Sequence, residues 1–227
     1  MKNQSGVLTR KSLALLVAIA VASAVAITVY ISRRPSNIVV AKPPAEIEDY
    51  LFWQAKDLTD FKLMGADAKT FGVNDLKGKW SFIFFGYTHC PDVCPLTMGI
   101  LGQAFRLIEK NPAASQEIQG VFISVDPKRD TPELLKEYVS HFNNKFLGVT
   151  GETAQLDAVS RQMSALYTID KEPGKPVDVY QVTHSSTIFL VDPQGRLYGR
   201  FPPPLTPQEI AGAFINIRTF YNEGIKK

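Results

Sequence analysis

An uncharged apolar run near the amino end divides the sequence into two parts that cannot fold in the same way. Residues 12–31 read SLALLVAIAVASAVAITVYI, about the length that a helix needs to cross a bilayer. A cleaved signal peptide is the alternative, because Arg10 and Lys11 precede the run and the ASA at 22–24 resembles a cleavage site. Since the apolar core of a signal peptide usually spans only about 7 to 15 residues, we interpret residues 12–31 as an uncleaved transmembrane anchor.

The charges beside the anchor do not orient it, because three Lys or Arg residues precede it and three follow it. Long domains cross a membrane largely regardless of such charges, so we place the short tail, residues 1–11, in the cytoplasm. A tail of this length is too short for a typical mitochondrial presequence. We therefore expect a single-pass protein of the bacterial inner membrane, with its soluble domain in the periplasm.

The charge balance excludes one class of partner. Residues 1–45 hold six of the 25 Lys and Arg residues and none of the 22 acidic residues, which leaves the rest of the chain with a net charge of −3. With neither a basic stripe nor a recognisable nucleic-acid motif, we expect no nucleic-acid binding.

Residues 32–49 contain three prolines and are expected to form an extended spacer. Residues 50–227 are numerous enough for one compact domain.

Short apolar runs alternate with helical patterns through this domain. Apolar, aromatic-rich runs predict buried strands, and apolar residues recurring every three or four positions predict helices. The predicted elements are short strands in an irregular segment at 61–80, strands at 79–88 and 118–127, a short strand or loop at 146–151, helices at 94–111, 131–142, 153–166 and 206–222, and a hairpin at 179–201 around DPQG. This order predicts an α/β fold, a mixed sheet flanked by helices, and is compatible with a thioredoxin-like fold.

The only two cysteines lie four residues apart in GYTHCPDVCP, residues 86–95. Proline fits the first turn of a helix, so Pro91 is expected to place Cys90 at or next to the N-cap, where the helix dipole favours a thiolate. Cys94 then lies one turn on, on the same face. A disulfide is feasible, but this spacing also leaves room for a third ligand to a soft ion such as Cu(I), with zinc and iron as competitors. We expect an exposed dithiol that contributes little to the core.

Three histidines could supply a third ligand, and spacing alone does not choose among them. His184, in QVTHSSTIFLVDP, stands just before a predicted buried strand, where binding sites are commonly built, although a lone histidine there is more often a hydrogen-bonded polar residue. His89 adjoins Cys90 but would point to the other face of a continuing strand. His141 is expected to be a surface residue at a helix end.

Three segments together carry a family resemblance. GYTHCPDVCP, ISVDPKRDTP at 123–132 and VTHSSTIFLVDPQG at 182–195, in this order and behind a membrane anchor, resemble the SCO/SenC family of copper chaperones for cytochrome c oxidase assembly. The resemblance covers roughly residues 50 to 222. It implies a thioredoxin-like fold in which Cys90, Cys94 and His184 bind one copper ion, Cu(I) or Cu(II). The family often has an acidic residue before this histidine, whereas this chain has Thr183, which leaves the ligands intact but changes their surroundings.

Two functions fit this reading. The first is a membrane-anchored metallochaperone, not an enzyme and without catalytic residues, that delivers copper to the copper-binding subunit of cytochrome c oxidase. The second is a thiol–disulfide oxidoreductase that reduces the copper-site cysteines of that subunit, with Cys90 attacking and Cys94 resolving. His184 separates the two, because a metal site needs it and dithiol exchange largely does not.

The acidic residues near the motifs have an ordinary structural explanation. Asp126, Arg129 and Asp130 could form a loop that docks a partner or supports the site. We favour the simpler reading, in which Asp126 caps a turn while Asp130 and Thr131 organise the next helix start. The charge of Asp92, between the cysteines, suits a helix N-terminus with or without a metal.

Overall fold

The computed structural model describes residues 16, 19–23, 42–65, 69–171 and 180–225. The chain forms two units, Met1–Ala41 and Lys42–Lys227, and the second is called the domain below. In the first unit residues 19–23 are helical. The predicted anchor at 12–31 lies mostly outside the described residues, and no helix within them is both long and apolar enough to cross a membrane.

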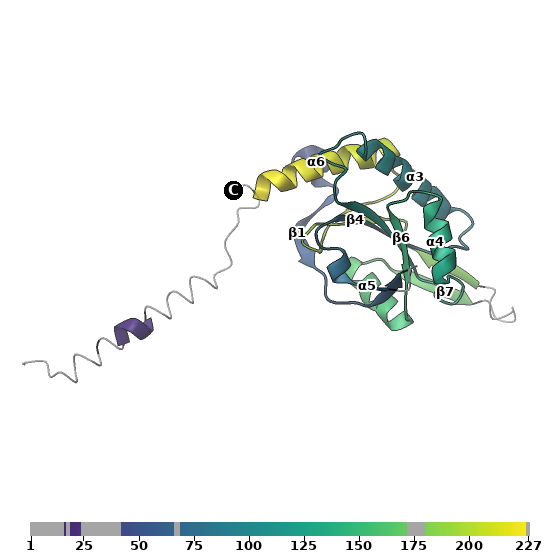
Figure 1. Cartoon of the computed structure of the whole chain (residues 1–227), viewed down its shortest axis with the longest axis horizontal. Coiled ribbons are helices and arrows are strands. Elements are labelled where there is room, and N and C mark those ends of the chain that lie inside the picture. Colours follow the sequence, from purple (N-terminus) through teal and green to yellow (C-terminus); the bar gives the residue numbers. More distant parts are fainter. Residues whose placement is uncertain (1–15, 17–18, 24–41, 66–68, 172–179, 226–227) are drawn as a thin grey trace, which may run out of the picture. The chain divides into compact units, whose positions relative to one another are not determined.

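A mixed sheet forms the centre of the domain (Figure 1), and its strands carry most of the apolar runs that the sequence predicted. In spatial order, the strands described are β1 (Leu51–Asp57), β10 (Arg196–Phe201), β9 (Ile188–Val191), β4 (Trp80–Gly86), β5 (Ile118–Ser124), β6 (Phe146–Thr150), β2 (Leu63–Gly65) and β3 (Thr70–Phe71). Strands β4, β5 and β6 are parallel to one another, and β9 is antiparallel to β4. The prediction of a mixed α/β sheet flanked by helices, in the thioredoxin-like manner, is confirmed.

Helices cover both faces of this sheet. Figure 1 shows α3, α4 and α6 along one face and α5 on the other. The described helices of the domain are α2 (Ala45–Glu48), the 3₁₀ helix η1 (Val73–Asp75), α3 (Val93–Ile108), α4 (Pro132–Ser140), α5 (Thr153–Met163) and α6 (Pro207–Ile225). The unit β4–α3–β5–α4–β6 places two crossover helices on the same face of parallel neighbours, the arrangement that the right-handed crossover rule produces.

The core lies between the central strands and helices α3 and α6. Every residue of β4 and β5 is buried, as expected for strands covered on both faces. The ring of Phe82 packs edge-on against those of Phe105 and Phe214, with ring centroids 5.1 and 4.9 Å apart. Each fully buried aromatic side chain of this kind stabilises the fold by about 1.5–3 kcal/mol, so these contacts fasten β4 to α3 and α6.

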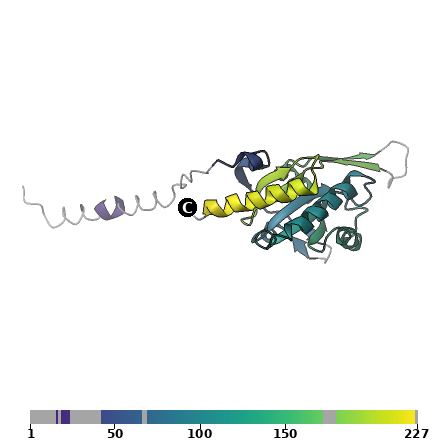
Figure 2. The ribbon, with the colours of Figure 1, turned by 90° about the horizontal axis from the view of Figure 1, so that it is seen from above.

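A separate two-stranded ribbon corrects the predicted hairpin. Strands β9 and β10 do form a hairpin around DPQG, but the residues before them belong elsewhere. Strand β8 (Tyr180–His184) pairs antiparallel with β7 (Tyr167–Lys171), and this pair forms its own sheet. Figure 2 shows the green ribbon projecting from the domain. Residues 185–187, which have no regular structure, separate β8 from β9 and end the predicted continuous run.

Two further boundaries differ from the prediction. The spacer was expected to reach residue 49, but α2 already packs against α6 and buries Ile47 in the core. Helix α5 ends three residues earlier than predicted, because Ser164 adopts a left-handed conformation with φ of 57°. Neither boundary lies in the loop and helix that carry the cysteines or in strand β8, which carries His184.

Candidate metal centre

Cys90 lies in the loop that connects β4 to α3. Its backbone N–H donates to the carbonyl of Tyr87 at 3.3 Å, which closes a turn directly after the strand. Helix α3 begins at Val93 with Asp92 at the N-cap, so Cys90 stands two residues before the cap, not at or beside it as predicted. Pro91 belongs to the loop and does not form the first turn of the helix.

The sulfur of Cys90 nevertheless lies at the positive end of the helix. The side chain of Asp92 makes no capping hydrogen bond, and the backbone N–H of Cys94 donates instead to Cys90 Sγ at 3.4 Å. This N–H is one of the first-turn donors that have no partner within a helix. The predicted position of the Cys90 sulfur at the start of the helix is therefore kept, although the residue lies outside the helix itself.

Cys94 is fully buried, which corrects the expectation of an exposed dithiol. Its side chain points from the first turn of α3 toward Gly86, where a Cβ atom would lie only 2.7 Å from Cys94 Sγ. Burial, with a smaller contribution from the neighbouring Cys90, raises the pKa of the Cys94 thiol well above its usual value. The two cysteines are not joined by a disulfide. Cys94 is therefore a protonated thiol at neutral pH until a metal or an oxidant replaces its proton.

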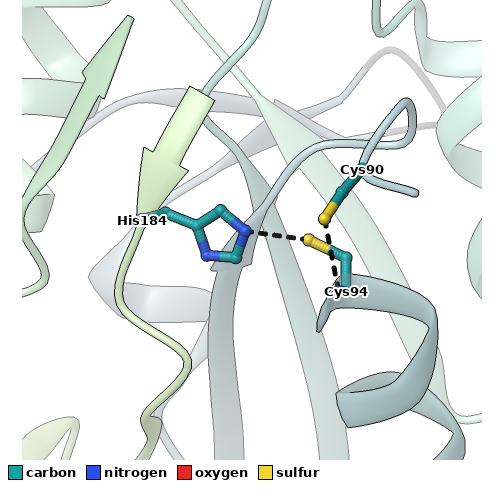
Figure 3. Close-up of side chains that lie close together, drawn as sticks. All are labelled: Cys90, Cys94 and His184. Atoms are coloured by element: carbon teal, nitrogen blue, oxygen red, sulfur yellow. Dashed lines mark hydrogen bonds between the residues drawn. The ribbon is translucent and has the colours of Figure 1, made fainter. Parts of the chain in front are cut away.

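His184 reaches Cys94 from the last position of β8, as Figure 3 shows. Its Nε2 lies 3.0 Å from Cys94 Sγ, and its Nδ1 lies 3.1 Å from the carbonyl of Ser185. Donation from Nδ1 to this carbonyl leaves the Nε2 lone pair facing the thiol. Burial lowers the pKa of His184, so the ring is neutral at pH 7 and ready to act as a ligand.

Strand pairing explains how a residue so distant in sequence arrives here. Strand β9 runs antiparallel to β4 with Phe84 opposite Ile188, so the start of β9 lies at the same sheet edge as the end of β4. His184 precedes Ile188 by four residues, and the cysteine loop follows β4. The imidazole packs edge-on against Phe84 and Tyr87, which fixes the orientation of the ring.

The three side chains form a compact set of potential metal ligands. One ligand atom from each of Cys90, Cys94 and His184 lies within 4.8 Å of the others. Two thiolates and one imidazole suit soft or borderline ions, and Cu(I), Zn²⁺ and iron all fit this donor set. The structure thus brings together all three residues that the sequence singled out.

Comparison with known proteins identifies the family. The model of the SCO1/SenC family matches residues 54–218. The chain belongs to the SCO1/SenC family. A SCO2-like protein of Rickettsia felis is 36% identical over 152 residues, which cover 66% of this chain and 72% of that protein.

Solved structures of SCO proteins have the same fold. Arabidopsis thaliana ScoI with copper bound is 32% identical, with a TM-score of 0.64, and the match covers 71% of this chain and 98% of that one. Bradyrhizobium japonicum ScoI with copper bound is 34% identical, with a TM-score of 0.61, and the match covers 70% and 98%. The thioredoxin-like fold and the family resemblance are therefore confirmed, and copper is the metal that these two relatives hold.

The other two histidines of this SCO/SenC chain lie apart from the three ligand atoms. His89 is half exposed, with Nδ1 3.0 Å from Thr88 Oγ1 and 3.6 Å from Asp130. His141 follows α4, and its Nδ1 lies 2.7 Å from the carbonyl of Glu137, so it interacts with its own helix end as predicted. Thr183, which stands where the family often has an acidic residue, donates to Asp170 at 3.3 Å.

The reading of residues 126–131 as caps is correct only in part. Thr131 caps α4 by accepting from the N–H of Leu134. The backbone carbonyl of Asp126 closes a turn by accepting from the N–H groups of Arg129 and Asp130, as predicted. The carboxylates of Asp126 and Asp130 are nevertheless buried and bind distant residues of the site region instead of capping α4. The sequence could not show these contacts, because Asp130 binds Thr88, 42 residues away, and Asp126 binds Tyr180, 54 residues away.

Proposed function

We propose that this protein is a copper chaperone that binds one copper ion through Cys90, Cys94 and His184 and delivers it to the copper-binding subunit of cytochrome c oxidase. The observation that carries the proposal is the set of three ligand atoms within 4.8 Å. Copper-bound relatives with the same fold support the choice of copper among the ions that fit. The protein itself is then a carrier and not an enzyme.

The exposure of the ligands suits transfer more than storage. Cys90 is partly exposed, whereas Cys94 is fully buried. A ligand of the receiving protein can therefore approach the site beside Cys90 and exchange with it. Three protein ligands leave coordination positions open to such exchange, whereas a closed four-ligand site would resist it.

Anaerobic titration with Cu(I) against a competing chelator tests this function. The domain, residues 42–227, has its own core and serves as the soluble fragment. We expect one equivalent to bind tightly, and His184→Ala to weaken binding by more than roughly 100-fold, beyond the range seen when only a residue behind a ligand is lost. His141→Ala is the matched control and should bind like the wild type. Weak binding that is indifferent to His184 would contradict the proposal.

A thiol–disulfide exchange function is the second candidate, because the two sulfurs are close and unjoined. The Cys90 thiolate would attack one sulfur of a partner's disulfide and release the other as a thiol. Cys94 would then attack Cys90 Sγ, leaving a Cys90–Cys94 disulfide and a partner reduced by two electrons. The burial that raises the pKa of Cys94 opposes its ionisation and so argues for a slow second step. Reduction of an oxidase-subunit disulfide at a rate unaffected by His184→Ala would favour this function.

We propose further that residues 12–31 anchor the protein in the bacterial inner membrane, with the domain in the periplasm. The support is the length and apolar character of the run, followed by a proline-containing spacer. A reporter enzyme active only in the periplasm, fused after residue 227, should be active. Release of the domain from membranes by a high-salt wash would contradict the anchor.

A further inference from the structure

The loop between β5 and α4 carries two buried carboxylates that the proposed copper site does not use. Asp126 and Asp130 are each only 1% exposed, and both lie in the segment 126–130, called the 126–130 loop below. A buried carboxylate is costly unless hydrogen bonds or an opposite charge compensate for the lost water. The partners of these two side chains therefore indicate what the loop stabilises.

Asp130 holds the cysteine side of the site. It accepts hydrogen bonds from the backbone N–H of Thr88 at 2.9 Å and from Thr88 Oγ1 at 2.6 Å. Ser124 Oγ, at the end of β5, donates to the same carboxylate at 2.5 Å. Thr88 precedes Cys90 by two residues, within the turn that Tyr87 and Cys90 close. Asp130 thus fastens the cysteine loop to the end of β5.

Asp126 holds the histidine side of the site. The hydroxyl of Tyr180, the first residue of β8, donates to Asp126 at 2.5 Å, and Arg129 Nε donates to the same carboxylate. Arg129 also donates to the Tyr180 carbonyl at 3.4 Å, and its guanidinium lies 3.8 Å from the centre of the Tyr180 ring. Tyr180 precedes His184 by four residues on the same strand. Asp126 and Arg129 thus fasten β8 to the loop.

We propose that the 126–130 loop sets the distance between the histidine and the cysteine pair, so that Asp126, Arg129 and Asp130 are positioning residues for the metal site. The proposal rests on the proposed copper-binding function. Within the described residues β8 pairs only with β7 and is not part of the main sheet, so sheet pairing alone does not fix His184 against the cysteines. The loop is hydrogen-bonded to both halves of the site, to Thr88 on the cysteine side and to Tyr180 on the histidine side. The guanidinium carbon of Arg129 also lies 5.5 Å from the centre of the Tyr87 ring, and this ring packs on His184.

Conservative variants of the domain test the two attachments separately. Tyr180→Phe removes the hydroxyl that binds Asp126 and keeps the ring, and Asp130→Asn keeps the shape of the side chain but weakens its bonds to Thr88. Each should weaken Cu(I) binding about 10-fold, as loss of groups that orient metal ligands does. Each should also shift the sulfur-to-copper charge-transfer absorption of the Cu(II) form, which a loss of stability alone would not do. Lys128→Gln, an exposed neighbour in the same loop, is the control and should change neither.

A double-mutant cycle shows through which ligand each attachment acts. If Tyr180 acts through His184, Tyr180→Phe should weaken Cu(I) binding no further in a His184→Ala background. Asp130→Asn acts through the cysteine loop and should keep its full effect there. Fully additive effects for Tyr180→Phe would overturn its assignment to the histidine side.

The outcomes separate this proposal from the function on which it rests. If His184→Ala leaves copper binding unchanged, both the proposed function and the positioning role are contradicted. Binding that depends on His184, with folded Tyr180→Phe and Asp130→Asn domains at wild-type affinity and spectrum, would overturn the positioning role alone. If Asp130→Asn does not fold, Thr88→Val removes the 2.6 Å bond from the other side at nearly constant volume, and the same two readings decide.

Discussion

The two halves of the candidate site are built by different means. Cys90 and Cys94 come from one junction of loop and helix, and four residues of chain bring their sulfurs together. His184 lies 90 residues beyond Cys94 and arrives on a ribbon outside the main sheet. The cysteine half therefore depends on local geometry, whereas the histidine half depends on the fold as a whole and on the loop contacts of Tyr180.

This difference teaches where the site is vulnerable. A change that loosens the domain separates His184 from the cysteines before it separates the cysteines from each other. A dithiol can thus persist in a domain that has lost its three-ligand site. Variants that act on one half and spare the other sharpen the comparison.

The largest effect is expected from loss of either sulfur. Cys90→Ala and Cys94→Ala should each abolish tight Cu(I) binding, because a single thiolate and an imidazole remain. Their effects on stability should differ: Cys94 is fully buried and its loss should cost about 1 kcal/mol, whereas loss of the partly exposed Cys90 should cost little. Chelator competition and denaturant unfolding of the apo domains measure the two quantities. Equal destabilisation by the two variants would contradict the burial difference.

Gly86→Ala should come next, because it crowds the buried thiol from the strand side. An added Cβ would lie 2.7 Å from Cys94 Sγ and 2.8 Å from the ring of Phe122. We expect destabilisation of about 1–3 kcal/mol, typical of overpacking, together with weaker copper binding. Gly99→Ala on the same helix as Cys94 is the control, since a Cβ there meets nothing within 4 Å. A Gly86→Ala domain as stable as Gly99→Ala would show that the thiol can move aside freely.

The stability of the apo domain should depend on pH through His184 in one range and through Cys94 in another, with a smaller effect than the substitutions above. The folded state lowers the pKa of His184 from 6.5, so as the pH falls below 6.5 the unfolded state takes up the proton first and stability decreases. The folded state raises the pKa of Cys94 from 9.0, so above pH 9.0 the unfolded state loses its proton first and stability again decreases. Each slope is at most about 1.4 kcal/mol per pH unit.

Unfolding of the variants across this range separates the two contributions. His184→Ala should reduce the loss of stability below pH 6.5 and leave the loss above pH 9.0 unchanged. Cys94→Ala should do the reverse. A loss of stability below pH 6.5 that is unchanged in His184→Ala would mean that the imidazole is not held neutral by burial.

The smallest effect is expected at Thr183. Thr183→Val removes the 3.3 Å hydrogen bond to Asp170, but the residue is exposed and its side chain does not touch the ligand atoms. Stability should change by no more than about 0.5 kcal/mol, and Cu(I) affinity by about 2-fold at most. A larger loss of affinity, measured by the same chelator competition, would mean that Thr183 replaces the family's acidic residue in tuning the site.

The sequence predicted those elements whose signal is local. Strands β4 and β5 are mostly apolar runs, and helix α4 has Thr131 as its cap and Pro132 in its first turn, so their existence followed from pattern alone. Strand β1 went unnoticed because most of it is exposed at the sheet edge and it lacks clear alternation. Strand β8 was wrongly predicted to be part of the hairpin around DPQG. That turn signal indicates only that the two strands it joins, β9 and β10, pair with each other.

The site divides in the same manner. The cysteine pair followed from spacing, whereas His184 was singled out only by resemblance to a family, since nothing local marks it as a neighbour of Cys94. A site-supporting role for Asp126 and Asp130 was one of two readings of the sequence, but pattern alone could not favour it, because a side chain that caps a turn and one that binds a distant strand have the same sequence signature.

The two sulfurs differ in burial, so they should differ in their reactivity toward reagents in solution. A water-soluble alkylating reagent meets Cys90 at the surface, as a sulfur beside a helix end, but reaches Cys94 only when the helix start opens. The apo protein thus contains one fast thiol and one slow one. A reagent or another protein's thiolate that arrives from outside therefore meets Cys90 before it meets Cys94.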